Sequence, residues 1–325
     1  MEYVNFGSAG IKVSRLALGM AFRGQADEVI AERVVNYAID QGINLIDCAN
    51  IYGPMDDRAN IGRSEIILGR ALKGKRDNVV ITTKVCGKIG SGPNDSGLSR
   101  GHIMREVQRS LQRLGTDYID VYLVHGPDAF TPQEETIRAL DDLVTSGTVR
   151  YVGCCNFSAW QVCRALWIAE KSRCVSYMCV QHPYSLANRG LETEMFGFIR
   201  NQGLGVMAYS PLGVGLLSGT YGPNQVAPNG SLWATRRKDI YNKTMDDVAE
   251  LVKTLHDEAT QLDKTPAQLA LAWVLAHPEV TVAISGADTL EHIDDNLGGL
   301  GWPIPTDVME KLNKASAGMR LILDW

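Results

Sequence analysis

The chain has 325 residues, of which 45% are hydrophobic and 21% charged, and its formal net charge is −5. This composition excludes a disordered or collagen-like chain, and the acidic balance does not favour a nucleic-acid partner. No apolar run approaches the roughly 20 residues that cross a bilayer, so we expect no membrane partner. Seven cysteines lack any C-x-x-C pair, and residues 1–5 do not read as a secretory signal. We therefore expect a reduced, cytoplasmic protein without a metal site.

Near-continuous apolar runs alternate with amphipathic segments along the chain. In chain order, we predict strands at residues 14–20, 44–49, 78–85, 119–126, 149–157, 176–182, 205–210 and 280–285. Strands of this kind are typical of parallel sheets that are buried on both faces. We predict helices at residues 26–41, 64–72, 101–114, 132–146, 159–171, 191–202, 245–261, 266–276 and 290–297. Five of these helices are followed by a glycine, the residue that most easily ends a helix.

Eight strands that alternate with helices indicate either a parallel (β/α)8 barrel or a doubly wound sheet. A doubly wound dinucleotide-binding sheet would carry G-x-G-x-x-G after its first strand, and residues 19–24 lack it. We therefore predict an α/β protein with one (β/α)8 TIM-barrel domain over residues 1–325. Residues 3–13 are expected to form a β-hairpin that plugs one end of the barrel. Residues 221–242 form the longest predicted loop.

Four polar side chains stand at or just after the ends of three consecutive predicted strands. Asp47 ends the second strand and Tyr52 follows it, while Lys84 and His125 end the third and fourth strands. Because the carboxyl ends of barrel strands meet at one mouth, we expect these four side chains to converge. Each of them alone is more often a structural residue than a functional one, so the hypothesis depends on the combination.

The chemistry of this set favours proton transfer to or from an oxygen atom. A free tyrosine has a pKa near ~10, and a nearby ammonium such as that of Lys84 lowers this pKa. A carboxylate such as Asp47 holds the lysine, and a neutral His125 can hydrogen-bond a carbonyl oxygen beside the phenol. The set therefore predicts protonation of a carbonyl or deprotonation of an alcohol. It offers no nucleophile and base for acyl transfer.

At these residues the sequence resembles the aldo-keto reductase superfamily over nearly its whole length. The shared motifs are Asp47-x4-Tyr52-Gly53, Gly62-x-Ser64-Glu65-x3-Gly69 and Ser110-Leu111-x2-Leu114-x2-Asp117-Tyr118-x-Asp120, which leads to His125. The resemblance points to microbial and plant members near the potassium-channel β-subunit branch. It implies a barrel that binds a nicotinamide cofactor without a Rossmann fold.

The resemblance also implies roles for individual residues. Tyr52 would be the general acid and base, tuned by Lys84 and Asp47, and His125 would orient the substrate. The implied cofactor contacts are Asn156 and Gln181 on the carboxamide, Tyr209 on the nicotinamide ring, Ser210, Leu212, Gly215, Leu217 and Ser218 along the pyrophosphate, and Gly286, Asp288, His292 and Asn296 near the adenosine. The candidate substrate contacts are Met20, Phe22, Asn50 and Phe157.

The sequence departs from the family pattern where the cofactor's 2′-phosphate would bind. Relatives that prefer NADP often carry lysine or arginine in this stretch, whereas residues 285–292 offer only His292. Asp288 and Glu291 would repel a phosphate, although residues 236–238 (Arg-Arg-Lys) could compensate. We expect NADP(H), with NAD(H) as the alternative.

These observations predict an NAD(P)(H)-dependent oxidoreductase that interconverts an aldehyde or ketone and an alcohol. One alternative is an NAD-linked dehydrogenase of a sugar or cyclic alcohol. Another is a cofactor-binding, redox-sensing regulatory subunit. The expected partner is a small-molecule carbonyl compound or alcohol, and the sequence leaves the oligomeric state open.

Overall fold

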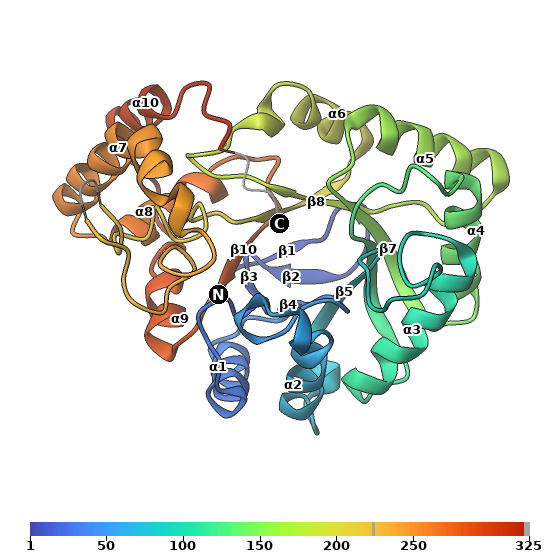
Figure 1. Cartoon of the computed structure of the whole chain (residues 1–325). Helices are drawn as coiled ribbons and strands as arrows, with labels where there is room; N and C mark the ends of the chain where they lie inside the picture. Colours follow the sequence, from blue (N-terminus) through green and yellow to red (C-terminus); the bar gives the residue numbers. More distant parts are fainter. Residues whose placement is uncertain (223–224, 322–325) are drawn as a thin grey trace.

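Eight parallel strands close into a barrel, which confirms the predicted fold class (Figure 1). The computed structural model describes residues 1–222 and 225–321. The barrel strands are β3 (Leu16–Gly19), β4 (Leu45–Asp47), β5 (Val80–Val85), β6 (Ile119–Val124), β7 (Val149–Cys155), β8 (Cys179–Pro183), β9 (Gly205–Tyr209) and β10 (Val282–Gly286). Each pairs with its neighbour in the chain, and β10 closes the ring against β3.

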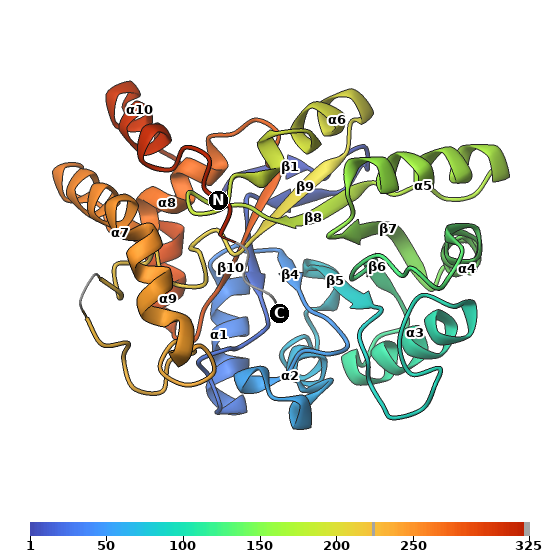
Figure 2. The same cartoon turned by 45° about the horizontal axis from the view of Figure 1, so that its top comes forward.

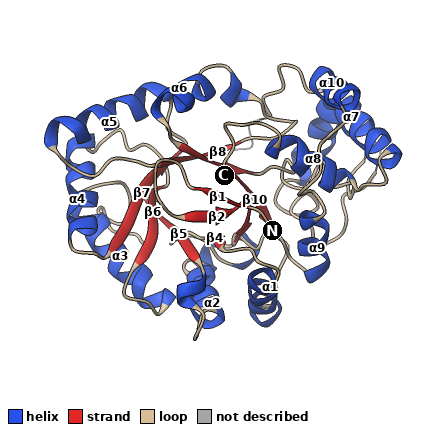
Figure 3. Cartoon of the chain, turned by 180° about the vertical axis from the view of Figure 1, so that it is seen from behind, coloured by secondary structure: helices blue, strands red, loops and turns tan. Residues whose placement is uncertain are grey.

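The helices surround the strands, so that the barrel is covered on its outside (Figure 3). They are α1 (Glu28–Asp40), α2 (Arg63–Ala71), α3 (Arg100–Leu114), α4 (Gln133–Thr145), α5 (Ala159–Ser172), α6 (Met195–Gln202), α7 (Lys238–Gln261), α8 (Pro266–Leu275), α9 (Leu290–Leu297) and α10 (Thr306–Ala315). Within the described residues, none of these helices is long and apolar enough to cross a membrane.

Two neighbouring threonines on β5 illustrate how each strand directs its side chains alternately to the barrel interior and to the layer between strands and helices. Thr82 faces the barrel interior and contacts Asp47, whereas Thr83 faces outward and contacts Glu65 of α2. Successive side chains of a strand point to opposite faces, so one strand serves both the interior and the helix layer. The outer core between strands and helices contains most of the buried apolar residues.

The N-terminal hairpin closes one end of the barrel, as predicted. Strands β1 (Tyr3–Asn5) and β2 (Lys12–Ser14) pair antiparallel. Phe6 and Val13 are fully buried and belong to the same apolar cluster as interior barrel residues. Gly7 lies against the start of β9 and has a φ of 58°, so a side chain there would overlap the carbonyl oxygen of Met178. The hairpin therefore plugs the amino-terminal end, and the predicted catalytic side chains lie at the opposite end.

We expect Gly7→Ala to lower the free energy of unfolding by about 2–3 kcal/mol, because the new Cβ meets backbone atoms and the left-handed conformation adds strain. Urea unfolding measures this change. Gly10→Ala is the matched control, since a Cβ at Gly10 has no heavy atom within 4 Å. Equal stability of the two variants would contradict the tight hairpin contact.

The structure differs from the predicted elements mainly in the C-terminal third. Helix α7, drawn in orange at the left of Figure 2, begins at Lys238 rather than at residue 245. The reason is that Tyr241 packs against Trp233 and Tyr221 and extends the buried face. This shortens the predicted loop 221–242, of which residues 223–224 lie outside the described part. Helix α10 was not predicted; it packs beside α7. The predicted helix at 191–202 starts only at residue 195, after a 3-10 turn over Gly190–Glu192.

Candidate active site

The four predicted catalytic side chains meet at the carboxyl end of the barrel. The Tyr52 hydroxyl lies 3.4 Å from Lys84 Nζ and 3.3 Å from His125 Nε2. Lys84 Nζ also donates to Asp47 Oδ2 at 2.8 Å and to the carbonyl oxygen of Cys48 at 2.6 Å. Asp47 and Lys84 are buried, whereas Tyr52 and His125 are only partly buried. The ion pair therefore lies beneath the two groups that a substrate could reach.

Burial and the ion pair set the charges of the deeper groups. Burial is the largest single influence and disfavours the Lys84 ammonium, but attraction to Asp47, Tyr52 and Cys155, together with the hydrogen bond to Asp47, outweighs it, and the pKa of Lys84 is raised. Burial, followed by the nearby Lys84 charge, lowers the pKa of His125 to about 3. At neutral pH the site therefore holds a charged lysine and a neutral imidazole.

The pKa of Tyr52 moves in the opposite direction from the one that the sequence suggested. Burial is the largest influence and raises it, while Lys84 lowers it by a smaller amount. The net pKa lies above the ordinary value, because desolvation of the phenolate exceeds the attraction of the ammonium. The expectation of a lowered pKa is therefore wrong for this structure, and the phenol is protonated at neutral pH.

The loop that carries Tyr52 is attached to the helix layer by buried polar contacts. Asn50 has no exposed surface, and its amide donates to Glu106 of α3 at 3.1 Å. The backbone carbonyl of Tyr52 accepts from the backbone amide of Ser64, the serine of the second motif, at 3.3 Å. Asn50 is thus buried against α3 and helps to hold the loop in place, and its contact with a substrate stays a prediction.

The motif residue Glu65 has a related structural function. Its carboxylate is fully buried and accepts from Thr83 Oγ1 at 2.5 Å and from Arg113 Nε at 2.6 Å. It therefore ties β5 to α2 and α3 from the outside of the barrel. A buried carboxylate of this kind needs such partners, because an unpaired charge there is strongly destabilising.

The other three candidate substrate contacts are apolar and closely packed. Met20, Phe22 and Phe157 are 0%, 3% and 2% exposed, respectively. Met20 and Phe22 follow β3, and Phe157 follows β7, where its ring packs edge-on against Tyr177. They belong to the core cluster in this structure, and contact with a substrate stays a prediction.

Three residues predicted to contact the nicotinamide lie next to the catalytic groups. The Tyr209 hydroxyl donates to Asn156 Oδ1 at 3.0 Å, and Asn156 Nδ2 donates to the carbonyl oxygen of His125 at 3.1 Å. Gln181 is buried and donates to Asp47 Oδ1 at 2.9 Å, and its other end accepts from the Cys155 thiol. Asn156 and Tyr209 are accessible at the mouth, whereas Gln181 is directed into the barrel.

The loop after β9, residues 210–219, has the backbone expected of an anion-binding segment. Left-handed φ values occur at Ser210, Gly213, Val214, Gly215 and Gly219. Backbone amides in such turns can point toward a phosphate. The buried indole of Trp233 donates to the carbonyl oxygen of Val214 at 2.9 Å and holds a valine in a conformation that strains β-branched residues. The contact between Trp233 and Val214 was not predicted from the sequence, because the two residues lie 19 positions apart.

Within this loop, Leu212, Gly215 and Ser218 are partly exposed, whereas Leu217 is buried. The Ser218 hydroxyl donates to the carbonyl oxygen of Gly215 at 2.7 Å. Gly286, at the end of β10, is exposed, and a Cβ there would meet only the Gly19 carbonyl oxygen at 4.0 Å. This open space beside the amino end of α9 fits a phosphate group.

The predicted adenosine end carries more acidic than basic groups. Asp288 Oδ1 accepts from the amide of Gly24, and His292 Nδ1 accepts from the amide of Asp288 at 3.2 Å. Asn296 is buried and donates to the carbonyl oxygen of Gly286. Arg237 lies over the ring of Trp233, at 5.9 Å from its centroid. The residues thus fit a nicotinamide dinucleotide, but without a basic side chain between residues 285 and 291.

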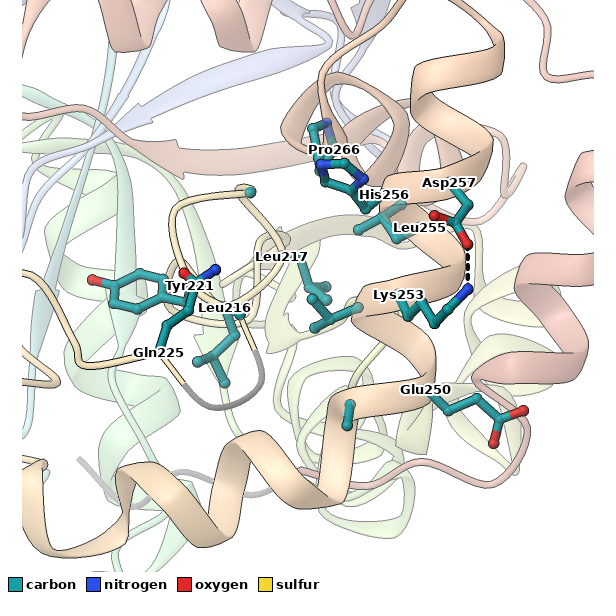
Figure 4. A pocket seen from close by; sticks show the side chains of 14 residues that line it. Leu216, Leu217, Tyr221, Gln225, Glu250, Lys253, Leu255, His256, Asp257 and Pro266 are labelled. Carbon is teal, nitrogen blue, oxygen red and sulfur yellow. Dashed lines mark hydrogen bonds and ion pairs between the residues drawn. The ribbon is translucent and has the colours of Figure 1, made fainter.

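A cavity of about 500 Å³ lies on the outer side of the 210–219 loop (Figure 4). It is lined mainly by apolar side chains, namely Leu216, Leu217, Tyr221, Val252, Leu255 and Pro266. Lys253 and Asp257 of α7, which form an ion pair, also contribute to its wall. None of the four catalytic residues lines this cavity, so it is separate from the site at the barrel mouth.

Comparison with known proteins agrees with this geometry. Residues 15–317 match the sequence model of the Aldo/keto reductase family. The chain is 38% identical to "Uncharacterized oxidoreductase YrpG" of Bacillus subtilis (strain 168), over 98% of this chain and 97% of that protein. It is 36% identical to "Probable voltage-gated potassium channel subunit beta" of Arabidopsis thaliana, over 96% of both chains. The rice protein of the same name is 35% identical, over 98% of this chain and 96% of that protein.

Proposed function

The chain belongs to the aldo/keto reductase family and is an oxidoreductase, and from this premise we propose that it interconverts an aldehyde or ketone and the corresponding alcohol with Tyr52 as the general acid and base. NADP(H) is the proposed cofactor, and NAD(H) the alternative. The observation that carries the proposal is the position of the Tyr52 hydroxyl, between Lys84 Nζ and His125 Nε2.

In the direction of reduction, the substrate carbonyl oxygen accepts hydrogen bonds from the Tyr52 hydroxyl and His125 Nε2. The nicotinamide cofactor, which Asn156 and Tyr209 would hold beside the substrate, would supply the hydride that the carbonyl carbon accepts. Tyr52 donates its proton to the oxygen, and the adjacent Lys84 ammonium stabilises the phenolate that remains. Neutral His125 holds the oxygen without adding a competing charge. In the reverse direction, the phenolate accepts the proton of the alcohol.

The residues that would hold the cofactor are those already placed around the mouth. Asn156 and Tyr209 would contact the nicotinamide, and the 210–219 loop and the turn at Gly286 would contact the phosphates. Gln181 would need to turn its amide from Asp47 toward the mouth to bind the carboxamide. No basic side chain of residues 285–291 is available for a 2′-phosphate, which keeps NAD(H) as the alternative.

Fluorescence titration with NADPH and, separately, NADH tests the cofactor. We expect both to quench the protein's tryptophan fluorescence, with NADPH at least as tight as NADH if residues 236–238 or His292 hold the 2′-phosphate. Tighter binding of NADH would support the NAD-linked dehydrogenase, because Asp288 and Glu291 repel the extra charge. Binding of neither dinucleotide would contradict the proposal.

The pH dependence of turnover tests the acid and base. The pKa of His125 is lowered to about 3, so the ring stays neutral above that value. The pKa of Tyr52 is raised, so the phenol stays protonated past its ordinary value. We therefore expect the rate of carbonyl reduction to be nearly constant from about pH 5 to about pH 9 and to fall only at higher pH. A fall of the rate near pH 6.5 in steady-state assays would contradict this, because it would show that a histidine titrates in the working range.

A regulatory role is the second candidate, because two relatives carry the name of a channel subunit. A protein with this role would bind the dinucleotide and exchange it without turning over any of a broad panel of carbonyl compounds. Turnover of any panel member at a rate that Tyr52→Phe abolishes would favour the enzyme.

A further inference from the structure

Thr82 stands directly beside Asp47 in the barrel and is not used by the mechanism above. The two residues are partners in the register of β4 and β5, and both side chains face the interior. Thr82 is fully buried, and its hydroxyl donates to Asp47 Oδ1 at 2.5 Å. Asp47 Oδ1 is therefore the acceptor for the buried hydroxyl of Thr82.

Three donors divide the two oxygens of the Asp47 carboxylate between them. Oδ1 accepts from Thr82 and from Gln181, whereas Oδ2 accepts from Lys84 at 2.8 Å. The carboxylate plane is therefore held from both sides. If one donor on Oδ1 is lost, the carboxylate can rotate, and the direction in which Oδ2 faces Lys84 changes.

We propose that Thr82 is a positioning residue, whose hydroxyl orients the Asp47 carboxylate so that Lys84 Nζ is held against the Tyr52 hydroxyl. This inference rests on the proposed function of Tyr52. Thr82 itself touches neither the Tyr52 hydroxyl nor the open mouth. It acts through Asp47 and Lys84, two buried groups that are joined by a hydrogen bond of 2.8 Å.

The charged and titratable groups around the Tyr52 hydroxyl come from several elements. They are Lys84 on β5, Asp47 on β4, His125 after β6, Cys155 on β7 and Arg23 after β3. Lys84 is the group whose attraction most lowers the pKa of Tyr52. A less well placed ammonium therefore leaves the phenol a weaker acid.

The test compares two adjacent threonines that undergo the same change. Thr82→Val removes the hydroxyl inside the barrel and keeps the shape of the side chain. Thr83→Val removes the hydroxyl that donates to Glu65 on the outside of the same strand, from an equally buried position. Thr82→Ser keeps a hydroxyl at the inner position. The readouts are kcat and KM for carbonyl reduction, dinucleotide affinity, the pH profile and the midpoint of thermal unfolding.

For Thr82→Val, we expect kcat to fall about tenfold, as for the loss of one hydrogen bond to a charged group, with unchanged dinucleotide affinity. The alkaline limb of the pH profile should move to higher pH. Thr82→Ser should stay within about twofold of the wild type, and Thr83→Val should lower the unfolding midpoint while keeping kcat and the pH profile. The inference is wrong if Thr82→Val has the same kcat and pH profile as Thr83→Val.

A second readout works without turnover. Ultraviolet difference titration, taken as the difference between each protein and its Tyr52→Phe form, follows the ionisation of Tyr52 alone. Thr82→Val should shift this titration to higher pH, and Thr83→Val should not. If the wild type reduced no carbonyl compound, the proposed function would fail, while this titration would still decide the role of Thr82.

Discussion

Replacing Tyr52 with phenylalanine is expected to lower kcat for carbonyl reduction by at least about 100-fold and to leave dinucleotide affinity within about twofold. The change removes only the hydroxyl that lies between Lys84 Nζ and His125 Nε2. The ring stays, and with it the contact with the Lys84 ammonium, which lies 4.6 Å from the ring centroid. Steady-state assays with a broad carbonyl panel, together with fluorescence titration, measure both quantities.

The control is Tyr118→Phe, which removes a hydroxyl at the opposite end of the barrel. Tyr118 precedes β6, and its hydroxyl donates to Asp77 near the surface. This variant should keep the kcat of the wild type. If Tyr52→Phe retained wild-type kcat as well, a different group would have to deliver the proton, and the assignment of the general acid would be lost.

Replacing Lys84 with methionine should have the largest effect on stability, a loss of about 3 kcal/mol in the free energy of unfolding together with loss of turnover. Methionine keeps most of the apolar side chain but leaves the buried Asp47 carboxylate without its cation. Thr82 and Gln181 still donate to Asp47, which limits the loss. Urea unfolding at neutral pH measures the stability.

The direction in which the Lys84 pKa is shifted determines the pH range over which the ion pair stabilises the folded protein. A raised pKa means that the folded protein holds the proton more tightly than the unfolded chain does. The contribution is therefore complete below the ordinary value near 10.5 and is lost only as the pH rises through the folded pKa. Neutral pH lies well inside the range in which the ion pair is intact.

Lys75→Met is the matched control for the ion pair. Lys75 Nζ lies 3.4 Å from Asp40 Oδ1, and both side chains are substantially exposed, at 36% and 62%. A pair of this kind typically contributes less than about 1 kcal/mol. Equal losses in the Lys75 and Lys84 variants would mean that burial does not strengthen the inner pair.

The order of the elements and the convergence of the catalytic groups could be predicted from the sequence. Asp47, Lys84 and His125 were placed by one rule, that polar residues at the carboxyl ends of adjacent parallel strands meet at one mouth. Strand alternation would also have found Thr82, because it stands two residues before Lys84 and so faces the same side.

The buried hydrogen bond of Asn50 and the direction of the Tyr52 pKa shift could not be predicted in this way. Asn50 donates to Glu106, which lies 56 residues later in the chain. The direction of the Tyr52 pKa depends on whether burial or the charge of Lys84 is the larger influence. Both questions depend on distances between residues that are far apart in the sequence.

The sequence by itself determined the barrel, its hairpin plug and the meeting of Asp47, Tyr52, Lys84 and His125 at one mouth, because apolar periodicity and strand order are local properties of the chain. Only the tertiary structure decided that Asn50 is bonded to Glu106 of α3, that Thr82 and Gln181 share one oxygen of Asp47, and that the phenol of Tyr52 is protonated at neutral pH. The physical reason is that hydrogen-bond partners and desolvation are set by packing between distant segments, which local sequence patterns do not specify.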